Sequence, residues 1–163
     1  MAAIRVFCAA STFPSVRDCL GFAAGAGEGV LLAIDIDEGA ALDPDSADWA
    51  AVRLVYREDA APLTVAVLRD TNAAPAFRET LDRFTAALAA LHARDAPDAP
   101  AVRDFLTTTR AIVVVTLPAD ADDAALEAAA WFTRLFVEKY DGLLHADGEG
   151  FYDEDNDLLV ALP

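Results

Sequence analysis

Residues 111–146, AIVVVTLPADADDAALEAAAWFTRLFVEKYDGLLHA, contain the pattern that decides the fold class. The run Ala111 to Leu117 is rich in β-branched residues, which predicts a strand in the interior of a sheet. Asp120, with Asp123 three residues later, is expected to start a helix that continues to Tyr140. A buried strand followed by a long helix indicates a domain that combines α and β structure.

The rest of the chain continues this alternation of strands and helices. Gly142 is expected to provide the left-handed residue that ends the helix. The other predicted elements are strands at 4–10, 30–36, 52–56, 63–69, 143–146, 151–152 and 158–162, and a helix at 16–23. The short link between 52–56 and 63–69 predicts that these two strands form an antiparallel hairpin.

A second long helix is predicted from Pro75 to Leu91. Its apolar residues recur at helical spacing and form one stripe, made of Phe77, Leu81, Phe84, Leu88 and Leu91. The two prolines in Arg94 to Pro100 are expected to break this helix and form a link. No domain boundary is expected there, because neither part of the chain is expected to bury its own sheet.

We therefore expect residues 1–163 to form a single α+β domain with a mixed or mostly antiparallel sheet and helices packed on one face. Strand, helix, strand and an acidic glycine turn occur twice, which suggests two similar halves at about 1–93 and 101–163. This layout resembles ferredoxin-like arrangements. The alternative is a three-layer α/β sandwich, favoured if 30–36 and 111–117 are adjacent parallel strands.

The chain is strongly acidic, with 28 Asp and Glu residues against 12 Lys and Arg and a formal net charge of -16 at pH 7. Phosphate groups would be repelled, so we expect no binding to nucleic acid or to an anionic membrane. A solubilising negative surface explains this charge most simply. A salt-adapted surface and a surface that meets a basic partner are the other two interpretations.

The chain is expected to be globular and cytoplasmic. Its hydrophobic fraction of 55% is too high for disorder. No apolar run approaches the roughly 20 residues that span a bilayer, and no leader peptide is evident. Cys8 and Cys19 are too few for a disulfide framework and are expected to be buried free thiols.

Two motifs suggest ligand sites but lack the required context. Gly25, Gly27 and Gly29 follow a predicted helix and precede a strand, whereas a phosphate-binding glycine loop follows a strand and opens a helix. Asp153, Asp155 and Asp157 have the spacing that opens a calcium loop, but the glycine and glutamate that complete it are missing, so a β-turn is expected.

His145, Asp147 and Glu149 are the candidate catalytic or metal-binding residues. If the strand from Leu143 continues through them, their side chains project from one face, where an imidazole and carboxylates can bind a metal or transfer protons. The simpler interpretation is a polar strand edge that runs into a turn. His92 is expected on the surface.

Trp131 is the candidate interface residue, because this indole interrupts a polar stripe formed by Glu127, Arg134, Glu138 and Asp141. Tryptophan is enriched at interface hot spots. We expect another element of the same chain or a second copy in a homodimer to cover it. This assumes that the face packed on the sheet consists of Leu126, Ala129, Ala130, Thr133, Val137 and Tyr140.

The sequence contains no complete catalytic set, and no cofactor is expected. The preferred hypothesis is a non-enzymatic, acidic protein-interaction or regulatory module that binds another protein or itself through Trp131 or a sheet edge. The alternative is a small metal-dependent or acid/base enzyme that uses His145, Asp147 and Glu149.

Overall fold

A computed structural model describes residues 2–25, 33–35 and 43–162. Their elements are β1 (Ala3–Cys8), α1 (Val16–Ala24), β2 (Ala33–Asp35), β3 (Ala51–Val55), β4 (Leu63–Arg69), α2 (Ala74–Ala89), α3 (Ala99–Leu106), β5 (Ala111–Thr116), α4 (Asp123–Lys139), β6 (Gly142–Ala146), β7 (Gly150–Tyr152) and β8 (Leu158–Ala161). Mixed α and β structure is therefore confirmed.

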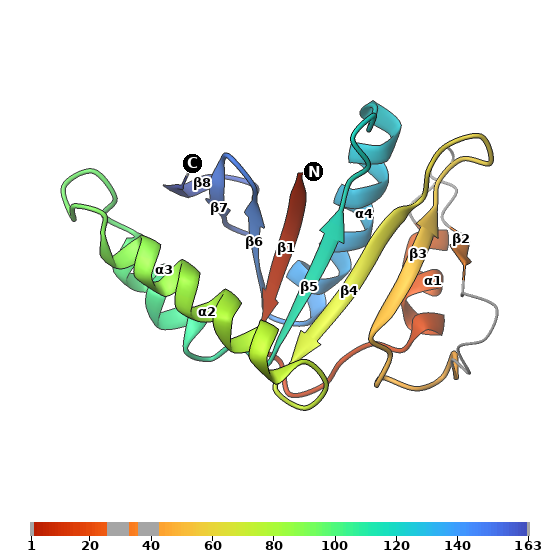
Figure 1. Ribbon diagram of the computed structural model, residues 1–163, viewed down its shortest axis with the longest axis horizontal. Helices are drawn as coiled ribbons and strands as arrows, with labels where there is room; N and C mark the ends of the chain where they lie inside the picture. Colours follow the sequence, from red (N-terminus) through yellow and green to blue (C-terminus); the bar gives the residue numbers. More distant parts are fainter. Residues whose placement is uncertain (1, 26–32, 36–42, 163) are drawn as a thin grey trace.

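The described strands form one sheet of eight in the order β2-β3-β4-β5-β1-β6-β7-β8 (Figure 1). Every neighbouring pair is antiparallel, including the predicted hairpin of β3 and β4. The expected interior position of β5 is confirmed, because β5 lies between β4 and β1.

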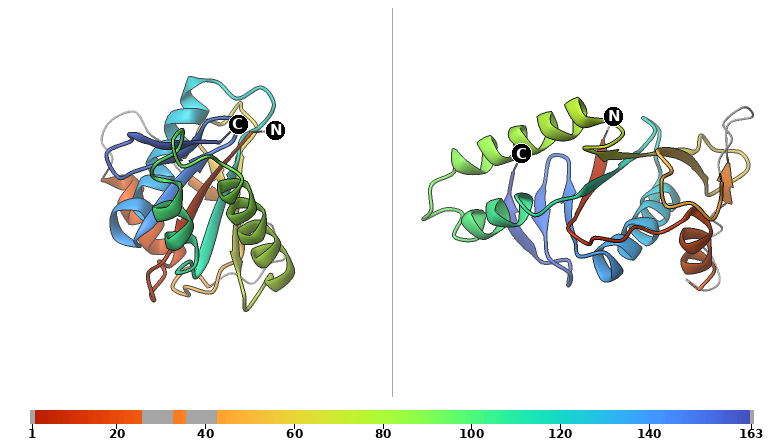
Figure 2. Two further views of the ribbon diagram at one scale, coloured as in Figure 1. Left: turned by 90° about the vertical axis from the view of Figure 1, so that its left-hand side faces the viewer. Right: turned by 90° about the horizontal axis from the view of Figure 1, so that it is seen from below.

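The sheet has an apolar core on each face, and β1 contributes to both. Val6 and Phe7 are neighbours on β1, so their side chains point to opposite faces, and both are fully buried. Val6 belongs to the core under α1 and α4, whereas Phe7 belongs to the core under α2 and α3. Figure 2 shows α2 on the opposite side of the sheet from α1 and α4.

The expectation that the helices pack on one face is therefore wrong. β1 and β5 are apolar on both faces, and a strand of this kind needs cover on both. The adjacent parallel strands of the alternative are also absent, because β2, the described part of 30–36, lies at the sheet edge beside β3. The result is three layers around an antiparallel sheet, and the ferredoxin-like layout is not confirmed.

The two expected halves are interleaved in the sheet. β1 comes from the first half, yet it pairs with β5 on one side and with β6 on the other. The strand, helix, strand unit of β5, α4 and β6 is therefore split by a strand from the opposite end of the sequence.

Both ends of α4 differ in detail from the sequence-based expectation. The cap at its start is Asp122, whose carboxylate accepts a hydrogen bond of 3.0 Å from the backbone N–H of Ala125. The left-handed residue at its end is Asp141, with φ of 49°. Gly142 instead begins β6, where an added Cβ would lie 2.5 Å from Cγ1 of Val6, so this position requires glycine because of close packing.

The helix α3 was not predicted, because the prolines in 94–100 suggested only a link. Pro100 lies in the first turn of α3, where the missing N–H removes no helical hydrogen bond. Ala99, Val102 and Leu106 are buried in the same core as the stripe of α2. Residues 99–106 therefore add a helix to the layer formed by α2.

None of the helices in the described part of the chain has both the length and the apolar character needed to cross a membrane.

The stripe of α2 generates a stability prediction. Phe84 is only 5% exposed, and its ring lies 5.4 Å from that of Phe7 and 5.6 Å from that of Phe151. Phe84→Ala should lower the free energy of unfolding by about 3–5 kcal/mol, as truncation of a buried aromatic residue does. Urea denaturation followed by circular dichroism measures this loss.

Leu126→Ala is the control, because this leucine of α4 is 48% exposed. This substitution should lower the free energy of unfolding by only about 0.5 kcal/mol, as an ordinary surface substitution does. Equal losses for the two variants would show that Phe84 is not a core residue.

Candidate functional site

Trp131 lies on the outer side of α4 and is half-buried. The guanidinium carbon of Arg134 lies 5.2 Å from the centre of its ring, which is a cation–π contact. Arg134 also forms an ion pair with Glu138, one helical turn further on. Glu127, Arg134 and Glu138 are exposed, so the indole lies among charged side chains as the sequence suggested.

The face of α4 that packs on the sheet is only partly the expected one. Ala129 and Thr133 are buried, but Leu126 and Ala130 are exposed. Val137 and Tyr140 are half-buried. The helix is rotated so that its two phenylalanines enter the core, and its buried residues are Ala125, Ala128, Ala129, Phe132, Thr133, Leu135 and Phe136.

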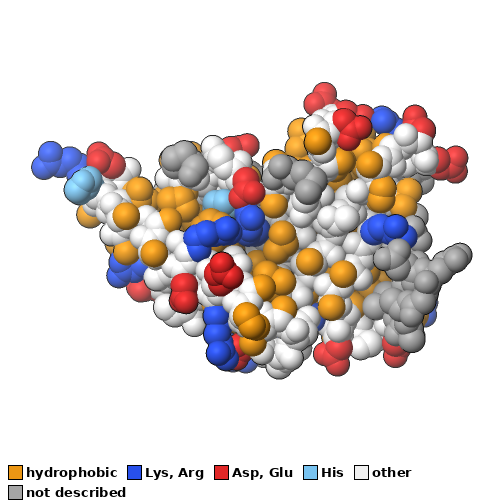
Figure 3. Space-filling model, in the orientation of Figure 1, with side chains coloured by type: hydrophobic (Ala, Val, Ile, Leu, Met, Phe, Trp, Pro, Cys, Tyr) orange, Lys and Arg blue, Asp and Glu red, His pale blue; other side chains and the backbone are white. Residues whose placement is uncertain are grey.

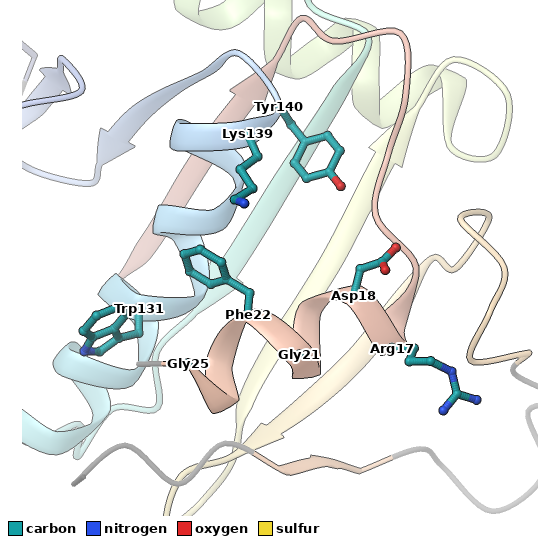
Figure 4. Close-up of a pocket in the computed structure, with 8 residues that line it drawn as sticks. All are labelled: Arg17, Asp18, Gly21, Phe22, Gly25, Trp131, Lys139 and Tyr140. Carbon is teal, nitrogen blue, oxygen red and sulfur yellow. The ribbon is translucent and has the colours of Figure 1, made fainter. Parts of the chain in front are cut away.

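One groove beside Trp131 lies between α1 and α4 and has a volume of about 610 Å³. Figure 4 shows Phe22 of α1 pointing toward α4, between Trp131 and Tyr140, while Arg17 points away. This groove extends to Gly25, which borders residues outside the described ranges. Gly27 and Gly29 of the glycine motif also lie outside them.

A second groove, of about 580 Å³, lies on the other side of Trp131, and we call it the acidic groove. Its lining residues come from α4, β1, β6 and the turn that joins β7 to β8. Besides Trp131, its apolar lining consists of Ile4, Ala130, Val137 and Leu144. All of its lining residues belong to the described part of the chain.

Four carboxylates line the acidic groove, and Arg134 is its one basic residue. Glu127 and Glu138 come from α4, whereas Glu154 and Asp155 come from the β7–β8 turn. The carboxylates therefore stand on two walls that belong to different elements.

The β7–β8 turn is fixed by Asp153. Its Oδ1 accepts hydrogen bonds from the backbone N–H groups of Asp155, at 2.9 Å, and Asp157, at 2.8 Å. Asn156 adopts a left-handed conformation, with φ of 63°. These residues form a hairpin turn, as the sequence suggested for the alternating aspartates.

The face that carries α2 and α3 has a different charge distribution. Figure 3 shows basic and acidic side chains next to each other near the middle of that face, with apolar side chains between them. The ion pairs Arg5–Asp147 and Arg78–Asp70 are examples of this local neutralisation. The excess of carboxylates in the acidic groove is therefore not a uniform property of the surface.

His145 is buried rather than placed at an open edge. It is 3% exposed, and its ring lies 4.5 Å from that of Phe84 and 4.8 Å from that of Phe151. Neither ring nitrogen has a hydrogen-bond partner in the described part of the chain. Burial, reinforced by the charge of nearby Arg5, lowers the pKa of His145 to about 4, so the imidazole is neutral at pH 7.

Asp147 and Glu149 do not continue the strand of His145, because β6 ends at Ala146. Asp147 forms an ion pair with Arg5, and its Oδ1 lies 3.9 Å from Nδ1 of His145. Glu149 is exposed and accepts a hydrogen bond from the hydroxyl of Tyr152. The structure thus brings Asp147 close to His145, while Glu149 bonds to a different group.

Neither a metal cluster nor a reactive thiol is found within the described ranges 2–25, 33–35 and 43–162. No group of three or more His, Cys, Asp or Glu residues there could hold a metal ion. Cys8 and Cys19 are free and buried, as expected. Burial raises the pKa of both thiols to about 12, which leaves them protonated and weakly nucleophilic at pH 7.

No protein-family model matches this sequence, and neither the curated proteins nor the solved structures gave a match.

The sequence singled out Trp131 as a candidate but did not reveal most of the residues that surround it in the structure. Leu144, Glu154 and Asp155 reach the groove through the pairing of β6, β7 and β8, which no local pattern reveals. Arg5 lies opposite His145 on the neighbouring strand. The one sequence feature that pointed to Arg5 was weak: it is the one charged residue in an otherwise apolar strand.

The environment of His145 generates a pH prediction. Its pKa is about 4 in the folded chain against a reference value of 6.5, so the unfolded chain takes up the proton first as pH falls. This contribution to stability is complete above pH 6.5 and is lost progressively toward pH 4. Urea midpoints at pH 7 and about pH 5 should therefore differ, and His145→Phe should reduce the difference.

His92→Gln is the matched control, because it removes an exposed imidazole and leaves the core around His145 intact. The charged groups closest to His145 are Arg5, Asp147 and Arg83, and all three are retained in both variants. If His145→Phe showed the same difference between the two urea midpoints as the native chain, other groups would be the cause of the acid sensitivity.

Proposed function

We propose that this chain is a non-enzymatic protein-interaction or regulatory module that binds through the surface around Trp131. The observation that supports this proposal is the position of Trp131, half-buried between two grooves on the outer side of α4. An aromatic residue beside concave apolar surface is typical of interface hot spots, since a partner can bury the whole ring.

The environment of His145 does not favour the enzyme alternative. A general base or metal ligand needs a nitrogen lone pair that substrate or metal can reach. Both ring nitrogens of His145 are enclosed, and aromatic rings pack against the imidazole. A buried neutral histidine in an aromatic cluster accounts for these contacts as part of the core.

The proposed location is the cytoplasm. The two cysteines are free thiols, which fits a reducing compartment.

Self-association is one way to cover Trp131 and gives the first test. Each chain carries a net charge of -16, so two copies repel each other and a homodimer should tighten when salt screens this repulsion. Light scattering at low and moderate salt should show more dimer at moderate salt. Trp131→Ala should weaken the dimer by roughly 30-fold or more, the effect of a hot-spot residue.

Leu126→Ala is the control for this experiment. Leu126 is an exposed residue of the same helix, and its side chain lines neither groove. A native chain that stays monomeric at both salt concentrations would contradict self-association. Equal effects of the two substitutions would contradict a specific role for Trp131.

A further inference from the structure

We infer that the acidic groove binds a basic segment of a partner protein, in which Lys or Arg side chains flank an apolar side chain. This inference rests on the proposed function and adds the chemistry of the partner. It depends on the apolar floor of the groove, the unpaired carboxylates on its walls and the rigidity of one wall.

The floor of the groove is apolar and incompletely covered. Ile4, Trp131, Val137 and Leu144 all line it and are all half-buried. An apolar side chain placed on this floor would remove both its own surface and theirs from water, which is favourable at about 25 cal/mol per Å². A hydrophilic polycation would leave this apolar surface exposed to water.

The walls of the groove carry uncompensated negative charge. Glu138 has an ion-pair partner in Arg134. Glu127, Glu154 and Asp155 have no ion-pair partner in the described part of the chain, and all three are exposed. Because these carboxylates stand on both sides of the apolar floor, they favour cationic groups on both sides of a bound apolar residue.

The wall formed by the β7–β8 turn is pre-organised for binding. The backbone at Asp155 is held by the carboxylate of Asp153, so little conformational entropy is lost when Glu154 and Asp155 meet a ligand. Neither Glu154 nor Asp155 uses its own carboxylate to hold this turn. Their charges can therefore be removed without removing the hydrogen bonds that shape it.

The charge of the groove also favours a basic protein segment over two other candidate ligands, a second copy of this chain and nucleic acid. A second copy docking groove to groove would bring two sets of unpaired carboxylates together, and nucleic acid would bring phosphates. A basic protein segment supplies opposite charge and an apolar side chain together. It therefore satisfies both the walls and the floor.

The test uses short synthetic peptides and the full chain. The first peptide alternates Leu with Lys, the second alternates Leu with Glu, and the third alternates Ser with Lys. Fluorescence anisotropy at low and moderate salt measures their binding, and spermidine is added as a competitor. We expect the Leu/Lys peptide to bind best and to weaken as salt increases.

Two variants locate the binding site. Glu154→Gln combined with Asp155→Asn should weaken the Leu/Lys peptide roughly tenfold, and Trp131→Ala should weaken it by roughly 30-fold or more. The matched control is Glu79→Gln combined with Asp82→Asn on the exposed side of α2, because it removes the same net charge on the opposite face of the sheet. This control should change the affinity less than twofold.

The outcomes separate this inference from the proposed function. Binding that depends on Trp131 but is equal for the Leu/Lys and Leu/Glu peptides would overturn the basic partner and leave the interaction surface intact. Equal effects of the groove and α2 double variants would overturn the acidic groove as the site. The inference would also be overturned if spermidine displaced the Leu/Lys peptide and bound as tightly as that peptide does. Absence of binding by all three peptides would overturn it as well. Binding unaffected by Trp131→Ala would contradict the proposed function itself.

Discussion

The whole fold depends on β1 being buried on both faces and paired on both edges. Val6 and Phe7 point to opposite cores, so β1 needs helices above and below it. Its two edges are satisfied by β5 and β6, which places the strand, helix, strand unit around it. This arrangement sets the position of α4 over β1 and β6, and with it the position of Trp131.

Sequence patterns identified most elements because local spacing determines them. The stripe of α2 and the β-branched run of β5 depend only on nearby residues, so both were predicted with nearly correct bounds. The choice of sheet face was wrong, because periodicity shows that a helix has an apolar side without showing which surface it meets. α3 was missed because a proline is compatible both with the end of one helix and with the first turn of the next. Pro100 lies in the first turn of α3.

The same division applies to the candidate site. Trp131 stood out from the sequence because its polar neighbours on α4 are local. The opposite wall of the acidic groove, with Glu154 and Asp155, arises from strand pairing far along the chain. His145 looked like an edge residue because its cover is long-range as well. Phe84 of α2 packs on its ring, and no spacing rule connects the two.

The pairing of β1 with β6 also has a consequence for synthesis of the chain. Arg5 and Asp147, which form an ion pair, are 142 positions apart. While the chain is being made, β1 emerges before both of its partner strands, and its second edge is closed only after β6 has been translated. An open apolar strand of this kind is prone to aggregation, and such long-range pairing slows folding. The second edge of β1 therefore stays unpaired in the nascent chain until translation has passed residue 146.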